Sequence, residues 1–465
     1  MSKESQRNPG RIQTLNVVAP PRLTDRIPAV LRQRDFRNFW TAQTVSYMGD
    51  QVTSIVLPLI AVMTLDASAA DMGLLVTLQQ LPLLLFSLHA GAWVDRRGRR
   101  RSTMIAANLA SAATVATVPL AHFTGSLTLP HLYAVSFVTG TLAVVFSVAV
   151  PGLFASLVPR EQYLSATSLS RASYSFSFVA GPSVGGAVVQ ILSAPFALVL
   201  DVFSFLVATV LLRAIPDREA TGKDEGEQGQ EKAEATQEDA GKPRDGIREA
   251  LRFLVATAVL RAKFVSGTAL NFFYTVYSTL LILFAARDLG LSAGLVGAVV
   301  SVGAVGALIG SAVTTRFSRR VGLGPTYLVG CLVFPAALVM TPLAHGPQWL
   351  VVAMLVAGEF VSAFGLMLFD ISGATLQQAI TPDRLRSRMQ GAQMAISYGV
   401  RPVGALVAGA LGTLLGVRPT LWIAVVGGFL SVLFLFRSPL RRVRDLPDEA
   451  EWPRPGAMDT VPTKE

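Results

Sequence analysis

The sequence predicts an all-α membrane protein in which twelve transmembrane helices form two six-helix bundles related by a pseudo-twofold axis. Three observations predict this fold: long apolar runs, basic residues in every second connection between them, and a second half that repeats motifs of the first. Hydrophobic residues make up 51% of the 465 residues, charged residues make up 15%, and the mean hydropathy is +0.50. Such a chain is too apolar and too weakly charged for an ordinary soluble protein.

Each of twelve apolar runs is about as long as a helix must be to cross roughly 30 Å of hydrocarbon. The runs lack the two-residue alternation of a barrel strand, so we expect helices, whose backbone hydrogen bonds are satisfied within each segment. The runs occupy residues 39–65, 72–94, 103–122, 131–152, 172–192, 196–213, 263–285, 293–313, 326–344, 348–371, 391–412 and 420–436.

The basic residues predict the topology. All but three of the 40 lysines and arginines lie in the two tails or in every second connection, and the exceptions are Arg287, Arg401 and Arg418. Because basic segments stay in the cytoplasm, we expect a multi-pass cell-membrane protein with both termini cytoplasmic. The net charge of +10 therefore reflects orientation in the lipid bilayer. No nucleic acid is expected as a partner, because its binding needs basic residues on a soluble surface.

Composition also divides the chain into parts. The linker is polar and highly charged up to Gly246, which predicts flexibility. The amphipathic segment Ile247–Leu260 that follows can lie on the membrane surface or lengthen the seventh helix. The first 38 residues show no cleavable signal, and the single Cys331 excludes an intrachain disulfide. The predicted parts are an N-terminal tail (1–38), a bundle (39–213), a cytoplasmic linker with an amphipathic helix (214–262), a second bundle (263–437) and a C-terminal tail (438–465).

Short motifs recur in the two halves. Gly310–Arg320 follows the eighth run as Gly91–Arg101 follows the second, with Thr314 in the place of Asp95. Gly181-Pro182 likewise matches Arg401-Pro402. Repeated halves predict a binding site between them near the middle of the membrane, which becomes accessible from each side in turn.

Three ionisable residues, Asp50, Glu359 and Arg401, are predicted to lie at similar depth, with Asp50 roughly 16 Å from its entry point at the rise of an α-helix. Charges inside a bilayer cost several kcal/mol unless they face water or a partner, so each is a functional candidate. Glu359 and Arg401 can form a structural ion pair. Asp50 has no predicted cationic neighbour, which makes it the first candidate for proton coupling and Glu359 the second. The alternative for Asp50 is a hydrogen-bonded anchor to Gln51 or to a neighbouring helix.

Other polar residues are sparse within the runs. If they face a cavity lined by apolar side chains, that cavity suits amphipathic organic molecules better than sugars. Each of them can equally serve helix packing, and Asp201, nearer the outer surface, is interpreted as structural. The candidate cavity residues are Gln79, Gln80, Tyr174, Asn271, Tyr274 and Tyr277.

The fifth run contains a small-residue motif of Gly181, Pro182, Gly185 and Gly186. Glycines four residues apart let helices approach closely, and a proline can bend a helix. This packing explanation is sufficient without any contact to a substrate.

The segment Gly91-Ala-Trp-Val-Asp-Arg-Arg-Gly-Arg-Arg matches G-x-x-x-D-R-x-G-R-R, and it resembles the loop between helices 2 and 3 of the major facilitator superfamily. Leu31–Trp40, Ser46–Gln51 and Pro159–Ala166 resemble the branch that contains macrolide-efflux proteins and the enterobactin exporter. The resemblance implies that Asp95 caps a helix of the opposite half and joins an ionic lock that holds the outward-open state. It makes Arg96, Arg99 and Arg100 the charged companions of Asp95, and Gly91 and Gly98 positions of close approach. The fifth-run motif is similar to that of drug–proton antiporters, with Ser177 where a glycine is expected.

We therefore expect a monomeric secondary active transporter that exports a hydrophobic or amphipathic small molecule, such as a drug, a macrolide-like antibiotic or a siderophore, in exchange for protons. The proton gradient is the expected energy source, with no cofactor or metal. An enzyme is not expected, because the sequence has no G-x-x-x-x-G-K-[ST] loop and no His or Cys cluster. The alternatives are an importer or uniporter of the same fold and a membrane sensor or scaffold that does not transport.

Overall fold

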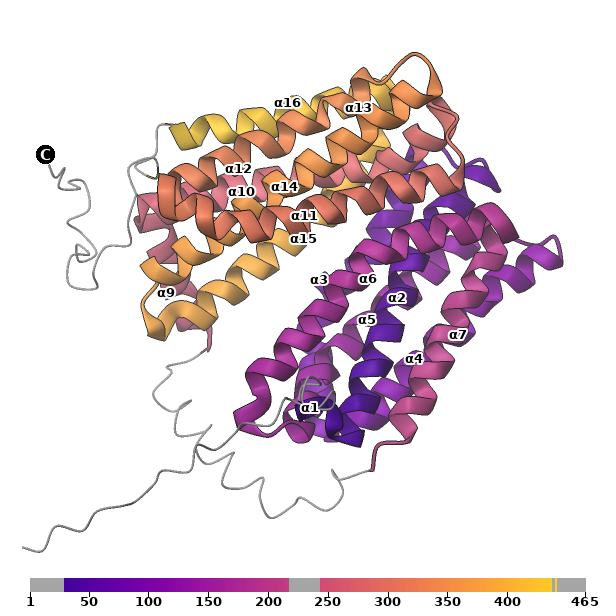
Figure 1. Cartoon of the computed structure of the whole chain (residues 1–465), viewed down its shortest axis with the longest axis horizontal. Coiled ribbons are helices and arrows are strands. Elements are labelled where there is room, and N and C mark those ends of the chain that lie inside the picture. Colours follow the sequence, from indigo (N-terminus) through magenta and orange to yellow (C-terminus); the bar gives the residue numbers. More distant parts are fainter. Residues whose placement is uncertain (1–28, 217–242, 437–439, 441–465) are drawn as a thin grey trace, which may run out of the picture.

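The computed structural model describes residues 29–216, 243–436 and Leu440, and these residues form helices and short connections without any strand. The helices make two bundles that meet at one end and diverge at the other (Figure 1). The predicted tails and linker lie largely outside the described residues. The helices are α1 (Ala29–Arg32), α2 (Arg34–Met63), α3 (Ala69–Arg97), α4 (Arg100–Phe123), α5 (Leu129–Leu157), η2 (Arg160–Gln162), α6 (Tyr163–Leu192), α7 (Ala194–Arg213), α9 (Pro243–Ala256), α10 (Ala258–Leu283), η4 (Phe284–Asp288), α11 (Ala293–Val321), α12 (Leu323–Leu338), α13 (Met340–Leu343), α14 (Gln348–Ile380), α15 (Asp383–Leu415) and α16 (Val417–Phe436).

Every predicted apolar run falls on one of these helices. Among the described residues, 11 segments are long and apolar enough to cross a membrane, and α12 with α13 forms one of them. The twelfth run lies on α16, whose described apolar part is Val417–Leu433. The prediction of an all-α protein with two six-helix bundles is therefore confirmed. Several helices continue beyond the predicted runs, and α14 in particular extends to Ile380.

The two bundles repeat the same packing. In the first, α2 packs against α6 and α7, while α5 packs against α3 and α4. In the second, α10 packs against α15 and α16, while α14 packs against α11 and α12. Glycines permit some of these contacts: a Cβ at Gly310 would lie 2.8 Å from the carbonyl oxygen of Phe364 on α14. Small residues thus let helices of one half approach each other closely.

Helix ends correct the predicted register between the halves. Helix α3 begins after Ser68, which forms a capping box with Asp71, and it ends at Gly98, whose φ is +62°. Helix α11 has the same length, 29 residues, and it ends at Gly322, whose φ is +101°. A positive φ suits glycine, because it has no Cβ.

When α3 and α11 are aligned at their last residues, Gly98 corresponds to Gly322. The counterpart of Asp95 is then Arg319, and the predicted match of Asp95 with Thr314 is wrong. Thr314 is buried and donates to the Gly310 carbonyl of its own helix, at 2.7 Å.

The amphipathic segment after the linker forms a separate helix, α9. The helix stops before Thr257, whose backbone is extended, and α10 begins at Ala258. Leu254 is buried, and α9 packs against α15 and α10. Of the two predicted possibilities, a simple extension of the seventh helix is excluded, because the backbone breaks between the two helices.

The halves contact each other mainly through two pairs of helices, α3 with α15 and α6 with α11, and α10 also contacts α3 and α2. A Cβ at Gly73 would lie 2.8 Å from Gly409 Cα, and one at Gly186 would lie 2.9 Å from Gly297 Cα. These crossings are related by the pseudo-twofold axis, because Gly73 and Gly297 each stand four residues after the first residue of α3 and α11.

The paired crossings also correct a second predicted match. The carbonyl oxygen of Pro182 lies against Gly297, and that of Ala405 lies against Gly73. Pro182 is therefore equivalent to Ala405, and the predicted match of Pro182 with Pro402 is wrong by about one helical turn.

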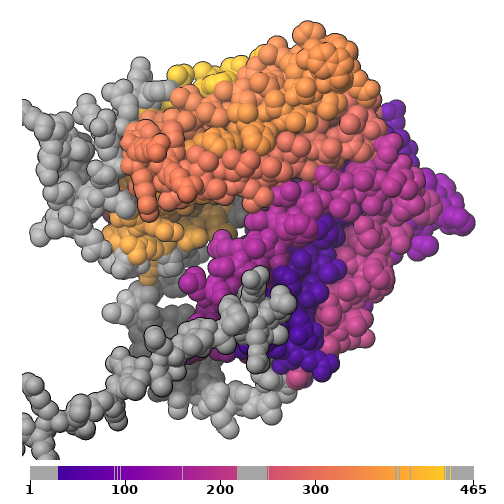
Figure 2. Space-filling view, viewed as in Figure 1, coloured from indigo at the N-terminus to yellow at the C-terminus, as the bar shows by residue number. Residues whose placement is uncertain are grey.

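All these close contacts lie at one end of the molecule, which we call the outer end after the predicted topology. Asp66 and Arg287 form an ion pair between the halves there, and Gln190 accepts a hydrogen bond from the Gly294 amide at 3.3 Å. The opposite, inner end carries α9 and the arginine-rich turn after α3, and there the halves diverge (Figures 1 and 2). The structure is thus closed at the outer end and open at the inner end.

Candidate functional site

Asp50 lies in the middle of α2 and is solvent-exposed. It shares one helical face with other polar residues at spacings of three and four, namely Gln43, Tyr47 and Ser54. The neighbouring residues point elsewhere, because Gly49 packs against α7 and Gln51 packs against Gly181 of α6. Polar faces of membrane helices turn towards the protein interior or water. Asp50 therefore faces the space enclosed by the helices.

The carboxylate of Asp50 makes no hydrogen bond or ion pair in the part of the chain that the structure describes. The predicted alternative, an anchor to Gln51, is not observed there. Two other groups lie within electrostatic range of Asp50: the hydroxyl of Tyr47 and the carboxylate of Asp201. The Tyr47 hydroxyl accepts a hydrogen bond from Gln43 at 2.9 Å.

Asp201 is fully buried between α7 and α2. It accepts hydrogen bonds from Thr53 of α2 and, at 2.9 Å, from Ser204 of its own helix. Gly49 gives it room, since a Cβ there would collide with the Asp201 carboxylate and the Ser204 hydroxyl. This arrangement agrees with the interpretation of Asp201 as a structural residue. Its carboxylate also interacts electrostatically with Asp50.

Glu359 occupies a different environment in the second half. Its side chain is 8% exposed and accepts a hydrogen bond of 2.8 Å from the Tyr277 hydroxyl, which also lies 2.7 Å from Thr341. Both Glu359 and Arg401 act electrostatically on Tyr274, so the two charges lie near one ring. Glu359 is therefore a hydrogen-bonded, buried acid, whereas Asp50 is an exposed one.

The predicted cavity residues differ in how exposed their side chains are. Tyr174 is 49% exposed, and its ring meets Tyr47 edge-on at 5.2 Å, so it extends the polar face of α2. Gln79, Gln80 and Tyr274 are half-buried.

Two of the predicted cavity residues make contacts within the protein. Asn271 is half-buried and donates to the Gly267 carbonyl of its own helix, at 3.1 Å. Tyr277 is 1% exposed, so its prediction as a cavity residue is wrong for this conformation.

Comparison with known proteins agrees with this geometry. A model of the Major Facilitator Superfamily matches residues 39–367 and 264–461. The chain belongs to the major facilitator superfamily. It is 25% identical over 432 residues to a protein of Mycobacterium tuberculosis H37Rv named multidrug efflux pump Tap, which covers 89% of this chain and 96% of Tap. It is also 25% identical over 397 residues to the MFS-type transporter YfiS of Bacillus subtilis, over 84% of this chain and 89% of YfiS.

Solved transporter structures share the fold of this superfamily member. A bacterial homologue of the iron transporter ferroportin, in an inward-facing state, has a TM-score of 0.67 at 16% identity and covers 87% of this chain and 98% of its own. The nucleoside transporter NupG also has a TM-score of 0.67, at 12% identity, with 86% and 97% covered. At these identities the similarity concerns the fold alone.

The arginine-rich turn of this transporter makes contacts within its own half. The Arg100 guanidinium packs against Gly152 of α5. Arg101 donates to the carbonyl oxygens of Leu212 at 2.9 Å and Arg213 at 2.7 Å, at the end of α7. Basic side chains are favourable at a helix C-terminus, because unpaired carbonyls and the helix dipole are negative there.

The predicted lock residues are not close to the other half at this open inner end. A Cβ at Gly91 would meet only Val148, at 3.9 Å, and one at Gly98 would meet nothing within 4 Å. Close approach at these glycines is implied for the outward-open form, which is closed at the inner end, so it stays a prediction; in the present form the positive φ accounts for Gly98. Arg96 and Arg99 are exposed. The side chain of Asp95 lies outside the described part of the chain, so its capping role stays a prediction.

The small-residue motif Gly181–Gly186, predicted in the fifth apolar run, lies on α6 and packs against both α2 and α11. Gly181 lies against Gln51, and a Cβ at Gly185 would lie 3.3 Å from Val52 Cα, so both glycines let α2 pack closely against α6. Gly186 and the carbonyl of Pro182 meet Gly297 of the other half. The packing interpretation accounts for all four residues.

Sequence reasoning missed two charges in the second half. Lys263 is the first residue of the predicted run 263–285 and is 8% exposed within α10, and Asp370 lies within α14, well before its last residue Ile380. Both stand at the edge of a predicted run. A signal that could have found them is helical spacing, because Asp370 follows Glu359 by eleven residues, about three turns.

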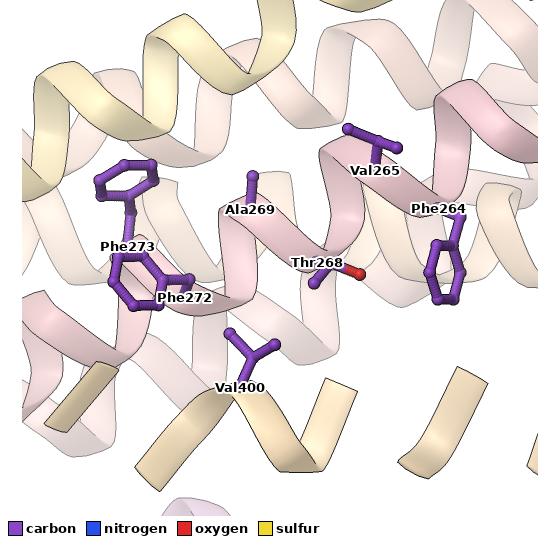
Figure 3. Close-up of a pocket in the computed structure, with 7 residues that line it drawn as sticks. All are labelled: Phe264, Val265, Thr268, Ala269, Phe272, Phe273 and Val400. Atoms are coloured by element: carbon purple, nitrogen blue, oxygen red, sulfur yellow. The ribbon is translucent and has the colours of Figure 1, made fainter. Parts of the chain in front are cut away.

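An apolar groove of about 410 Å³ runs along α10 (Figure 3). Its residues recur on one face of α10, with one contribution from α15, and this face is opposite to the one that carries Lys263 and Tyr277. We do not assign it to the candidate site, because no ionisable group lines it. The lining residues are Phe264, Val265, Thr268, Ala269, Phe272, Phe273 and Val400.

Proposed function

We propose that this transporter exports small amphipathic molecules across the cell membrane in exchange for protons, with Asp50 as the proton-carrying group. The observation that carries the proposal is the exposed Asp50 carboxylate in the middle of α2, which makes no hydrogen bond within the described residues. Export as the direction is supported by the similarity to the protein named multidrug efflux pump Tap.

The geometry suggests the order of events. With the outer end closed and the inner end open, a substrate enters from the cytoplasm and reaches the face of α2 that carries Tyr47 and Asp50. Asp50 releases a proton on that side, because the carboxylate is exposed to the open end. When the inner end closes and the outer end opens, Asp50 takes up a proton from outside and the substrate leaves. The change between the two states involves no covalent step.

An amphipathic substrate is supported by the mixed character of this wall. Aromatic rings and a carboxylate lie next to one another, since Tyr174 contacts Tyr47 edge-on and also stacks on Phe178. Such surfaces accommodate apolar bodies and leave a few polar groups to orient them. A susceptibility panel, which compares cells with and without the protein across chemical classes, narrows the substrate.

The deciding test measures efflux of a panel substrate from proteoliposomes with an imposed proton gradient. We expect gradient-driven efflux in the unaltered chain and its loss in Asp50→Asn, while Glu161→Gln, at an exposed acid of the short helix η2 outside the predicted membrane spans, retains it. Full gradient-driven efflux in Asp50→Asn removes Asp50 from this role. Net uptake instead of efflux indicates an importer, and absence of any flux indicates a sensor or scaffold.

A further inference from the structure

A buried lysine lies at the inner end of the second half. Lys263 of α10 is 8% exposed, and its ammonium group donates to the side-chain carbonyls of Gln377 on α14 and of Gln393 on α15, the latter at 3.4 Å. The protein makes room for this side chain, because a Cβ at Gly373 would lie 3.1 Å from Lys263 Cε. A buried cation is costly unless a negative group compensates it. Two neutral amides do not supply that compensation.

The cluster is rich in donors. An ammonium group carries three N–H bonds, and each glutamine that accepts through its carbonyl still carries an NH₂ group with two more. Within the described residues, the NH₂ groups of Gln377 and Gln393 have no recorded acceptor. A set of converging donors around one positive charge is the complement of a carboxylate or a similar single acidic group, which accepts several charge-assisted hydrogen bonds.

Among the described residues, the acidic group that acts on Lys263 is Asp370. It acts electrostatically on Lys263, but the two form no ion pair in the described structure. Asp370 is exposed, so part of its surface is available to solvent at the open inner end. Lys263 therefore has a nearby counter-charge that does not occupy its donors.

The site lies on one face of α14, and part of this face can be reached from the open inner end. Glu359, Asp370 and Gln377 follow one another on α14 at spacings of eleven and seven residues, which places them on one face. Glu359 fixes the direction of this face, because it is bonded to Tyr277 of α10 on the inside of the bundle. Gln377 and Gln393 are only half-buried, so their amides can be approached.

We propose that Lys263, Gln377 and Gln393 bind the acidic group of an amphipathic substrate, and that the Asp370 carboxylate competes with this group for the lysine. The proposal rests on the proposed function, since it names the chemical class of the transported molecule. It requires a substrate whose apolar body carries one carboxylate or a comparable monoanion.

Two probes that differ only in charge test the site. Dansylaminoundecanoic acid and its methyl ester have the same fluorescent body, and their binding to the full chain is measured in nanodiscs of phosphatidylcholine, without any gradient. We expect the acid to bind about tenfold more tightly than the ester, as for the gain of a charge-assisted hydrogen bond. In Lys263→Gln this preference is lost, and in Lys263→Arg it is largely kept.

Asp370→Asn gives the opposite result, because it removes the competing charge. We expect the acid to bind several-fold more tightly in this variant and the ester to bind as before. Ester binding also reports that each variant is folded. A merely structural lysine would change acid and ester binding together.

Equal binding of acid and ester to the unaltered chain, a preference that survives Lys263→Gln, or weaker acid binding in Asp370→Asn each overturn the proposal. Because binding is measured without a gradient, its outcome is separate from that of the efflux test. Proton-driven efflux with no acid preference refutes only the Lys263 site, whereas an acid preference without proton-driven efflux refutes only the exchange mechanism.

Discussion

Gly73 of α3 and Gly409 of α15 are in van der Waals contact across the two halves, so that a Cβ at Gly73 would lie 2.8 Å from Gly409 Cα and 2.6 Å from the Ala405 carbonyl oxygen. The equivalent contact joins Gly186 to Gly297. Both contacts exist only while the outer end is closed. They therefore stabilise the form that is closed at the outer end. A larger side chain at either crossing shifts the equilibrium towards the form that is open there.

Gly73→Leu should open the outer end. Overpacking of a tight contact costs about 1–3 kcal/mol, which corresponds to a roughly 5- to 150-fold loss of the form closed at the outer end. The measurement is the rate at which a cysteine placed at Thr77, which is buried and donates to the Pro402 carbonyl of the other half, reacts with a membrane-impermeant maleimide, in a chain whose only native cysteine, Cys331, is buried. We expect faster labelling in Gly73→Leu. Gly391→Leu is the control, since nothing lies within 4 Å of a Cβ at that position.

Unchanged labelling in Gly73→Leu would show that the two helices can separate locally without opening the outer end.

Gly49→Ala should destabilise the first half. The added methyl group collides with the carboxylate of Asp201 and the hydroxyl of Ser204, and α2 must move away from α7. We expect the free energy of unfolding to fall by about 1–3 kcal/mol, the usual cost of overpacking. The thermal unfolding midpoint in detergent checks this, and Gly391→Ala serves as the control. An equal midpoint for Gly49→Ala and the unaltered chain would contradict the close packing of Gly49 on Asp201.

The helices of this protein could be predicted from sequence because a bilayer imposes strong requirements. An apolar run of sufficient length must satisfy its own backbone, and a helix is the structure that does so. The same reasoning placed Asp50 correctly in the middle of α2. Its neighbours Gly49 and Gln51 could not be assigned to α7 and α6, because hydropathy gives the depth of a residue in the membrane but not the direction in which it points.

The errors have a common physical cause. Tyr277 was predicted in a cavity but is buried on Glu359, and the difference depends on how α10 and α14 pack, which no local pattern records. The match of Thr314 to Asp95 followed the letters of a motif, whereas the register depends on where the helices end. Lys263 was missed because it stands at the boundary between a basic connection and an apolar run.

Tyr277→Phe should lower the stability of the second half. It removes the donor that lies 2.8 Å from the buried Glu359 carboxylate and leaves Thr341 without this partner. An unsatisfied buried polar group costs about 1–3 kcal/mol. We expect a lower unfolding midpoint, which should recover in the double variant Tyr277→Phe with Glu359→Gln, because a neutral amide is less costly to bury than a carboxylate. Tyr174→Phe is the matched control, since Tyr174 is half exposed. Additive effects in the double variant would mean that the two side chains do not interact.

Arg101→Ala should loosen the inner end of α7. Its guanidinium bonds two carbonyl groups at the last residues of that helix, at 2.9 Å from Leu212 and 2.7 Å from Arg213. Hydrogen bonds to a charged group contribute about 1.5–3 kcal/mol where they are shielded from water, and less where they are exposed. One of these two bonds is exposed. We therefore expect the free energy of unfolding to fall by about 1 kcal/mol. Amide hydrogen exchange over residues 208–213 should become faster, while exchange at the outer end of α7 stays the same. Arg99→Ala is the control, because that side chain is exposed in the same turn. Equal exchange in the two variants would show that the carbonyls at the end of α7 are satisfied by water, and that the charge of Arg101 serves only to hold this turn beside the membrane.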